Sequence, residues 1–330
     1  MRKVSYKIAV SIVGVVLLVS LVLTGFSLSA TTNFMEEDAY EIMQLEATNK
    51  ALVFDKTVRR VKTAVGGMKS EVIKNFTYDP ATFTEADAQV LVDQVTKSVY
   101  LAAESASGNV NAYFVLNPDL VPNATDLYQA VYLLDPNDEY LAVSNQYSLS
   151  DLGQGKSPWY DQPIALEGSY WSGAYVNPKV NQSGRILTYS KRVMVDDVLV
   201  GVVGMDLNYS YFSDVIQDMQ LYTSGYAILL DEDRKVLVDL HRGTTVNDQV
   251  LGLPLTLLDQ GNLDQISKGI EDLGEGVKQI FYENEMKVVG YKTMDANGFT
   301  IVIIVPEDEV FAKLARVQSI FLMITLGGLA

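Results

Sequence analysis

The chain has 330 residues, a formal net charge of −16, no cysteine and one histidine. The acidic balance excludes a nucleic-acid partner, because phosphates require a basic protein face. Without cysteine there is no disulfide framework and no thiolate metal site, and a lone His241 argues against histidine-based metal or acid–base chemistry. We therefore expect no metal and no cofactor. The length fits two domains better than one.

The N-terminal segment has the pattern of a membrane anchor. Ile8–Ala30 contains no charged residue and is long enough to cross a bilayer core of roughly 30 Å. Basic residues precede it and acidic residues follow, which predicts that residues 1–7 are cytoplasmic and that residues 31–310 are extracytoplasmic. The alternative is a cleaved signal peptide.

The C-terminal segment predicts a second contact with the membrane. Residues 307–330 begin as an exit helix, and the stretch 317–330 is apolar but too short to span a bilayer by itself. It is either a buried terminal helix or the start of a truncated membrane helix. We expect the latter, with a signalling region beyond it.

Helical periodicity dominates residues 31–109. Apolar residues recur four and three positions apart between Phe54 and Val72, which predicts a long stalk helix. This helix is expected either to pack only on its own domain or also to pair with a second protomer, as in a homodimer. Thr84 followed by Asp87 has the pattern of a capping box that opens a second helix.

The periodicity then changes to that of strands. A first antiparallel module is predicted at 110–207, a linking helix within 208–224, and a second module at 225–306. Leu133-Leu134-Asp135 and Leu229-Leu230-Asp231 each end a strand at an acidic turn, and similar elements follow in the same order. The predicted fold is α+β, with two tandem modules behind a long helix and membrane helices on both sides.

An aromatic and acidic pattern points to a pocket in the first module. Pro158-Trp159-Tyr160 is followed by Tyr175 and by an apolar strand that carries Asp206 near its end. Aromatic rings make rigid walls with polar tips, and a carboxylate on an apolar strand is costly unless something positive meets it. The pattern favours a small ligand with a cationic group. The alternative is ordinary core aromatics and an Asp that caps the next helix.

These residues resemble the membrane-distal module of double Cache (dCache) sensor domains, the extracytoplasmic parts of bacterial chemoreceptors, sensor kinases and membrane-bound cyclases. The resemblance covers roughly residues 35–310 and implies two PAS-like modules. In amino-acid-sensing members the motif places Tyr, Arg, Trp, Tyr, Tyr and Asp around the ligand. Trp159, Tyr160, Tyr175 and Asp206 match the last four positions, so the resemblance implies that Asp206 pairs with a ligand ammonium inside an aromatic enclosure.

Two positions depart from that motif. Ser157 stands at the Arg position and Leu152 at the first Tyr position, so the carboxylate clamp of the family is in question. Lys156 is adjacent and offers a point charge without the planar fork of Arg. Amines therefore become more plausible ligands than in the family at large, beside amino-acid-like ones. Tyr132 and Tyr189 lie on strands of the same module and are further candidates for the pocket wall.

The resemblance implies a transmembrane signalling receptor, with a chemotaxis receptor as the first expectation and a histidine kinase or diguanylate cyclase as the alternative. Its partners are then a small-molecule ligand, the membrane and cytoplasmic signalling proteins. The sequence contains none of the common hydrolase, phosphate-loop or zinc-helix motifs, so no enzyme is expected in this stretch. A surface adhesion or scaffold protein without a small ligand is the alternative of another class.

Overall fold

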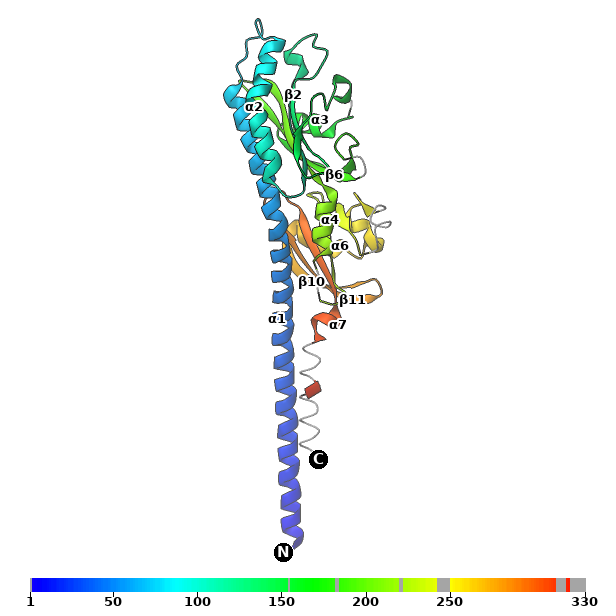
Figure 1. The fold of residues 1–330 in the computed structure, drawn as a ribbon. Coiled ribbons are helices and arrows are strands. Elements are labelled where there is room, and N and C mark those ends of the chain that lie inside the picture. Colours follow the sequence, from blue (N-terminus) through cyan, green and yellow to red (C-terminus); the bar gives the residue numbers. More distant parts are fainter. Residues whose placement is uncertain are drawn as a thin grey trace.

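Two sheet modules lie one above the other along a single long helix (Figure 1). The structure is a computed structural model that describes residues 2–153, 155–181, 184–219, 222–241, 250–312 and 319–320. The first module contains strands β1 to β7, and the second contains β8 to β12. The sequence prediction of an α+β fold with two tandem modules is confirmed.

Two helices precede the sheets. Helix α1 spans Arg2–Asn75, and helix α2 spans Glu85–Ser105. The predicted capping box is present: the Thr84 hydroxyl accepts from the Asp87 amide, and the Asp87 carboxylate accepts from the Thr84 amide at 2.8 Å. This cap satisfies two amides that the first helical turn leaves without partners, which is why α2 begins there.

The first module is a seven-stranded antiparallel sheet with the order β3-β2-β1-β7-β6-β4, and β5 also pairs with β6. Its strands are β1 Asn109–Leu116, β2 Gln129–Leu134, β3 Tyr140–Ala142, β4 Ser169–Trp171, β5 Tyr175–Val176, β6 Arg185–Val195 and β7 Val198–Asn208. Helix α3, Pro158–Ala165, lies between β3 and β4, and α4, Tyr209–Gln217, leads to the second module. The sequence analysis missed the short strands β4 and β5, because runs of two or three residues carry no periodicity.

The second module is a five-stranded antiparallel sheet with the order β10-β11-β12-β8-β9. Its strands are β8 Tyr226–Leu230, β9 Val236–Asp239, β10 Glu275–Tyr282, β11 Glu285–Thr293 and β12 Thr300–Pro306. Helix α6, Asp264–Leu273, and the 3₁₀ segment η3, Leu255–Gly261, cover one of its faces, and α7, Glu307–Val310, follows the last strand. Helix α6 was also missed.

The two sheets share one topology. Numbered within each module, and leaving out the edge strand β3 and the side pairing of β5, both follow the order 2-1-5-4-3, with the first and last strands side by side in the centre. A common order of this kind is what repetition of one module produces, and it gives equivalent positions that can be compared pair by pair.

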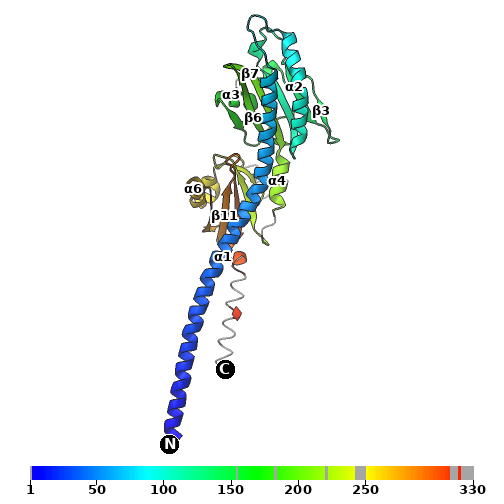
Figure 2. The same cartoon turned by 90° about the vertical axis from the view of Figure 1, so that its left-hand side faces the viewer.

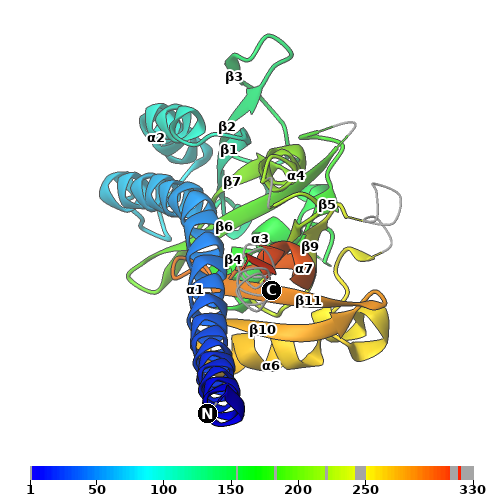
Figure 3. The same cartoon turned by 90° about the horizontal axis from the view of Figure 1, so that it is seen from below.

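Helix α1 runs along the same face of both sheets (Figures 2 and 3). Its buried stripe includes Met43, Phe54, Val65 and Val72, which share one core with residues of α2 and of both sheets. In the second module α1 approaches the backbone so closely that a Cβ atom on Gly290 would lie 3.0 Å from the Met43 carbonyl oxygen. The opposite face of each sheet is therefore the face on which a ligand site has room to form.

The predicted membrane segments are only partly within the described structure. Residues 8–30 belong to α1, which extends well beyond the second module in Figure 1, but most of their side chains lie outside the described part. Within the described residues, no helix combines the length and the apolar character needed to cross a bilayer. The second prediction, at 317–330, falls outside the described residues except for 319–320.

Candidate functional site

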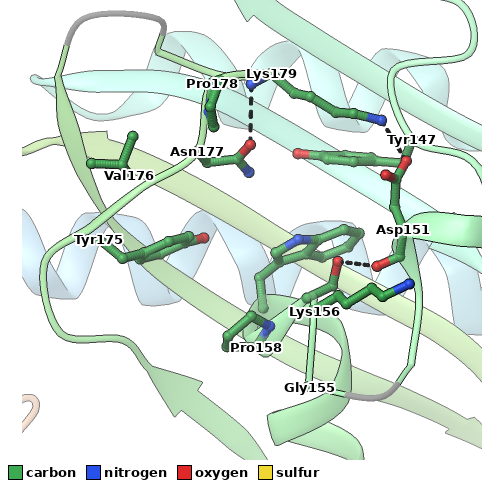
Figure 4. A pocket seen from close by; sticks show the side chains of 12 residues that line it. Tyr147, Asp151, Gly155, Lys156, Pro158, Tyr175, Val176, Asn177, Pro178 and Lys179 are labelled. Carbon is green, nitrogen blue, oxygen red and sulfur yellow. Dashed lines mark hydrogen bonds and ion pairs between the residues drawn. The ribbon is translucent and has the colours of Figure 1, made fainter.

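A cavity of about 520 Å³ lies on the face of the first module that is turned away from α1 (Figure 4). Helix α3, strand β5 and the loops at 147–157 and 176–179 surround it. Its lining residues are Tyr147, Asp151, Gly155, Lys156, Ser157, Pro158, Trp159, Tyr175, Val176, Asn177, Pro178 and Lys179. The volume, and a wall that combines three aromatic rings with polar and charged side chains, are those of a small-molecule site.

Trp159 is the centre of the aromatic wall. Pro158 at the first helical position starts α3 and orients the indole toward the sheet, where it is 3% exposed. The indole contacts Tyr147, with ring centroids 4.4 Å apart, and meets Tyr113 edge-on at 4.9 Å. Tyr113 lies directly over Gly204, where a Cβ atom would come within 2.3 Å of the phenol oxygen. The glycine in β7 therefore makes room for the ring that supports Trp159.

Asp206 lies one layer behind this wall and joins two of its members. Its carboxylate accepts from the Asn111 amide at 2.7 Å and from the Thr188 hydroxyl at 2.5 Å. Asn111 also donates to the Tyr147 hydroxyl at 3.1 Å, and the Tyr175 hydroxyl lies 2.7 Å from the Thr188 oxygen. Since the Thr188 proton goes to Asp206, Tyr175 must be the donor in its pair with Thr188.

This chain of hydrogen bonds gives Tyr175 a defined polarity. Its proton points inward to Thr188, so its oxygen is left as an acceptor on the cavity side, where the Asn177 side chain is one donor within hydrogen-bond reach, and in Figure 4 the hydroxyl points toward the cavity. The Asp206 charge, only one hydrogen bond further away, strengthens that acceptor. The Tyr175 end of the cavity thus favours a hydrogen-bond donor that carries positive charge.

The Asp206 carboxylate is buried without a cation. It is 1% exposed, and among the described residues its partners are the neutral Asn111 and Thr188. Burial raises the pKa of Asp206 from 3.8 to about 6, although the hydrogen bonds from Thr188 and Asn111 work in the opposite direction. Burial, with the Asp206 charge as a second cause, also raises the pKa of Tyr147 well above its usual value, so this phenol stays protonated.

Charged side chains lie at the other end of the cavity. Lys179 Nζ is 2.5 Å from Asp151 Oδ2, and the same oxygen accepts from the amide and the hydroxyl of Ser148. Burial works to raise the pKa of Asp151, but the hydrogen bonds from Lys179 and Ser148 outweigh it and hold this pKa below its usual value. Lys156 is exposed and makes no ion pair with any described residue.

The structure brings some of the predicted site residues to the cavity and places others behind it. Trp159, Tyr175, Lys156 and Ser157 line it. Asp206 is not a lining residue: its carboxylate lies beneath the wall, where Asn111 and Thr188 donate to its oxygens, and its pairing with a ligand ammonium stays a prediction. Tyr160 is behind Trp159 in the core of the module, with ring centroids 5.7 Å apart.

Tyr132 and Tyr189 do not line this cavity. Both pair across the sheet in the row that contains Ala112 and Met205, and this row points toward α1 and α2. Tyr189 is next to Thr188 in β6, and successive strand residues face opposite sides. The ring of Tyr132 meets Tyr100 of α2, with centroids 5.2 Å apart. The strand register, which the sequence left undetermined, decides both positions.

Sequence reasoning missed seven wall residues, four of which have polar or charged groups in their side chains, namely Tyr147, Asp151, Asn177 and Lys179. All four lie in loops or in single turns, where no periodicity indicates which way a side chain points. One signal was available: Ser148 and Asp151 have the spacing of a capping box, and the structure shows that box at the start of a 3₁₀ turn. No group of His, Asp or Glu within the described ranges has the arrangement of a metal site.

The fold and the cavity together define a class of protein, the tandem-module sensor domains. A family model described as Cache domain (dCache_1) matches residues 31–314. The chain therefore belongs to the Cache domain family, whose members are ligand-binding sensor domains and not catalytic ones.

Solved structures agree on the fold at low sequence identity. The periplasmic sensory domain of the Campylobacter jejuni chemoreceptor Tlp1 has a TM-score of 0.62 at 13% identity, with 84% of this chain and 98% of that chain covered. Methyl-accepting chemotaxis protein X has a TM-score of 0.60 at 13% identity, with 82% of this chain and 99% of that chain covered. An extracellular domain assigned to a histidine kinase, soHK1S-Z6, has a TM-score of 0.61 at 14% identity, with 84% of this chain and 98% of that chain covered. No curated protein sequence matches the chain.

Proposed function

We propose that this chain is the extracytoplasmic sensor of a membrane-anchored signalling receptor, and that it binds a small molecule in the cavity of the first module. The observation that carries the proposal is the cavity itself, about 520 Å³ in volume and walled by Trp159, Tyr147 and Tyr175. A scaffold or adhesion protein would have no need of a hollow at this place, and a filled interior would have favoured it.

The hydrogen-bond polarity of the wall supports a ligand with a cationic group. Tyr175 presents an acceptor oxygen, and Asp206 supplies an uncompensated buried charge behind it. A ligand ammonium at the Tyr175 hydroxyl relieves the cost of that charge without entering the layer beneath the wall. The ligand binding domain of Mlp24, which is similar in fold with a TM-score of 0.53 and 14% identity, was solved with asparagine, which has such a group.

Membrane anchoring is part of the proposal. Ile8–Ala30 is uncharged and long enough to span, and α1 continues from this stretch to the first module without interruption. On the other side, α7 leads from the last strand toward residues 317–330, which we assign to the start of a second membrane helix. The conformational change caused by ligand binding in the first module is then transmitted through α4, the second module and α7.

The kind of signalling output is the least determined part of the proposal. A chemotaxis signalling region is the first candidate, and a histidine kinase or diguanylate cyclase is the second; among the fold relatives are both a chemoreceptor domain and a domain assigned to a kinase. Whatever the output, the ligand transmits a signal only if it binds two states of the receptor with different affinity. A difference of about 1–3 kcal/mol between the binding free energies for the two states is typical.

Calorimetry on the chain in detergent micelles tests the binding step. The probes are amino acids, amines and organic acids, and the control is Trp159→Phe, which keeps an aromatic ring but shrinks the wall. We expect at least one probe class to bind the wild-type chain and to lose about ten-fold or more in affinity in the variant. Binding that is unaffected by Trp159→Phe would place the ligand elsewhere.

Crosslinking tests the transmission step separately. Cysteines introduced in residues 8–30 and 317–330, into a chain that contains none of its own, report the spacing of the two segments in membranes. We expect crosslinking rates to change when a bound probe is added. Rates that stay the same with saturating probe would contradict the route through α7.

A further inference from the structure

Asp151 and Lys179 form an ion pair at the end of the cavity opposite Tyr175 (Figure 4). They come from separate loops, and a third contact holds these loops together: Gln146 Nε2 donates to the backbone carbonyl of Lys179. Both charged side chains are lining residues of the cavity. The backbone of Lys179 is therefore held at the cavity by Gln146, independently of the pairing of its ammonium with Asp151.

Asp151 does not depend on Lys179 to keep its place. Its Oδ2 atom accepts from the Ser148 amide at 2.7 Å and from the Ser148 hydroxyl at 2.8 Å. Its backbone carbonyl also accepts from the Ser157 hydroxyl at 2.6 Å. The pair with Lys179 is partly exposed, with side-chain accessibilities of 45% and 26%, and exchanges of such pairs cost little. Lys179 is thus the member that can change partners.

Lys156 adds a second cation at the same end. It lines the cavity next to Asp151 and is not paired with any described residue. The cavity therefore has two ammonium groups and one carboxylate at this end, and an acceptor phenol at the other. Ser157, at the position where the resemblance implies an arginine, uses its hydroxyl on the Asp151 backbone and does not point its donor at the cavity.

We infer that, in the ligand-free protein, the Asp151 carboxylate occupies the position beside Lys179 that the carboxylate of a ligand takes when the ligand binds. This inference rests on the proposed function, since it assigns one end of the ligand in the proposed cavity. When the ligand binds, its carboxylate forms ion pairs with Lys179 and with Lys156, and Asp151 keeps its hydrogen bonds from Ser148. The ligand class is then a small carboxylic acid, with its cationic group at Tyr175. Of the two ligand classes expected from the sequence, amines and amino-acid-like molecules, this selects the second, because Lys179 belongs to a loop that the sequence did not place.

The inference makes opposite predictions for the two members of one ion pair. Lys179→Met removes the partner of the ligand carboxylate and is expected to lower affinity about ten- to a hundred-fold. Asp151→Asn removes the competitor while keeping its shape, and is expected to raise affinity about three-fold or more. Lys156→Met, which removes the second cation, is expected to lower affinity about three-fold.

The two variants control for each other. Both remove the same ion pair, so unfolding of the ligand-free chain in urea is expected to shift equally and slightly in both. Affinities are measured by calorimetry on the full chain in micelles. The probes are matched triplets: an amino acid, the amine left after decarboxylation, and the acid left after deamination. In a triplet that binds, we expect the decarboxylated amine to bind at least ten-fold more weakly than the amino acid.

Three results would overturn the inference. One is a decarboxylated amine that binds as well as its amino acid, and the second is a loss of affinity in Asp151→Asn as large as in Lys179→Met. In both cases the proposed sensing site remains, since a probe still binds and still depends on Trp159. If no probe binds the wild-type chain, the proposed site itself is overturned, and this inference with it.

Discussion

The two modules share one strand order, yet the sheet face turned away from α1 borders a cavity in the first module and is packed with apolar side chains in the described part of the second. In the first module, Asn111, Asp206 and Thr188 form a polar row across β1, β7 and β6 on the face turned away from α1. The equivalent row in the second module is Tyr226, Ile304 and Val289 across β8, β12 and β11. The same backbone arrangement thus carries a charged site in one copy and an apolar core in the other.

The neighbouring row shows how the second module is filled. Ser190 of β6 in the first module corresponds to Tyr291 of β11 in the second. The Tyr291 ring is 1% exposed, and its hydroxyl lies where a Cβ atom on Gly269 of α6 would come within 2.2 Å. A large ring on the sheet and a glycine on the covering helix close the space that is open in the first module. Side chains in two rows, and not the topology, therefore decide which module has the cavity.

The largest expected effect comes from truncating the ring at the centre of each module. Trp159→Ala and Tyr291→Ala each remove a buried aromatic ring and are expected to lower the free energy of unfolding by about 3–5 kcal/mol. Only Trp159→Ala is expected to abolish probe binding, because Tyr291 is in the filled module. Urea unfolding and calorimetry on the same preparations measure the two quantities.

The matched pair separates stability from binding. If Tyr291→Ala weakened probe binding as strongly as Trp159→Ala, loss of folding alone would explain both results. The comparison between a hollow and a filled module would then fail as an account of function.

The second prediction concerns the charge in the polar row. The pKa of Asp206 is raised by burial from 3.8 to about 6, so between pH 4 and 6 the folded chain holds a proton that the unfolded chain has released. The contribution of Asp206 to the free energy of unfolding therefore falls as pH rises through this range, by about 3 kcal/mol in total, and stays constant above it.

Asp206→Asn removes that dependence. The variant is expected to match the wild-type chain at pH 4 and to be more stable by up to about 3 kcal/mol at pH 8. Urea unfolding at both pH values, without ligand, checks this. A variant that is less stable than wild type at pH 8 would mean that a cation outside the described contacts already compensates Asp206.

The helices and strands of the fold were largely predictable from the sequence. The face of the sheet toward which each strand side chain points was not. Strands such as β6 and β7 were found at nearly their observed bounds because apolar alternation and the Asp196-Asp197 turn define them locally. The sequence does not contain the register between β6 and β7 in any local form. That register places Thr188, which the sequence analysis did not consider, toward the cavity, and the candidate Tyr189 toward α1.

The site was predictable only where a motif covered it. Trp159 and Tyr175 were found through their resemblance to a family pattern, and both line the cavity. Tyr147 and Lys179 belong to loops whose positions depend on contacts far along the chain, such as the bond from Gln146 to the Lys179 carbonyl. Contacts of this kind are set by tertiary packing, and so single-sequence reasoning could not supply them.

The third prediction tests the hydrogen bond that joins Asp206 to the wall. Thr188→Val removes the donor to Asp206 and the acceptor of Tyr175, and is expected to cost about 1–3 kcal/mol of unfolding free energy at pH 8. Because the Thr188 hydrogen bond lowers the pKa of Asp206, its loss moves the pH-dependent step to higher pH. Thr188→Ser, which keeps the hydroxyl, is the control. Equal pH profiles for the two variants would contradict the role given to Thr188.

The smallest expected effects separate the two faces of the first module. Tyr175→Phe removes a hydroxyl that faces the cavity, and is expected to lower probe affinity about five- to ten-fold. Tyr132→Phe and Tyr189→Phe remove hydroxyls from the face toward α1 and α2, and are expected to change affinity less than about two-fold and stability by no more than about 0.5 kcal/mol.

These three substitutions delete the same atom from the same residue type within one sheet, so any difference among them is due to position. Tyr175 belongs to the network of Thr188 and Asp206, whereas the rings of Tyr132 and Tyr189 pack on Tyr100 and Trp171 and keep those contacts as phenylalanine. An affinity loss in Tyr189→Phe equal to that in Tyr175→Phe would mean that the ligand reaches the sheet from the α1 side. The cavity lined by Trp159 would then no longer explain binding, since a pleated sheet keeps neighbouring residues on opposite faces.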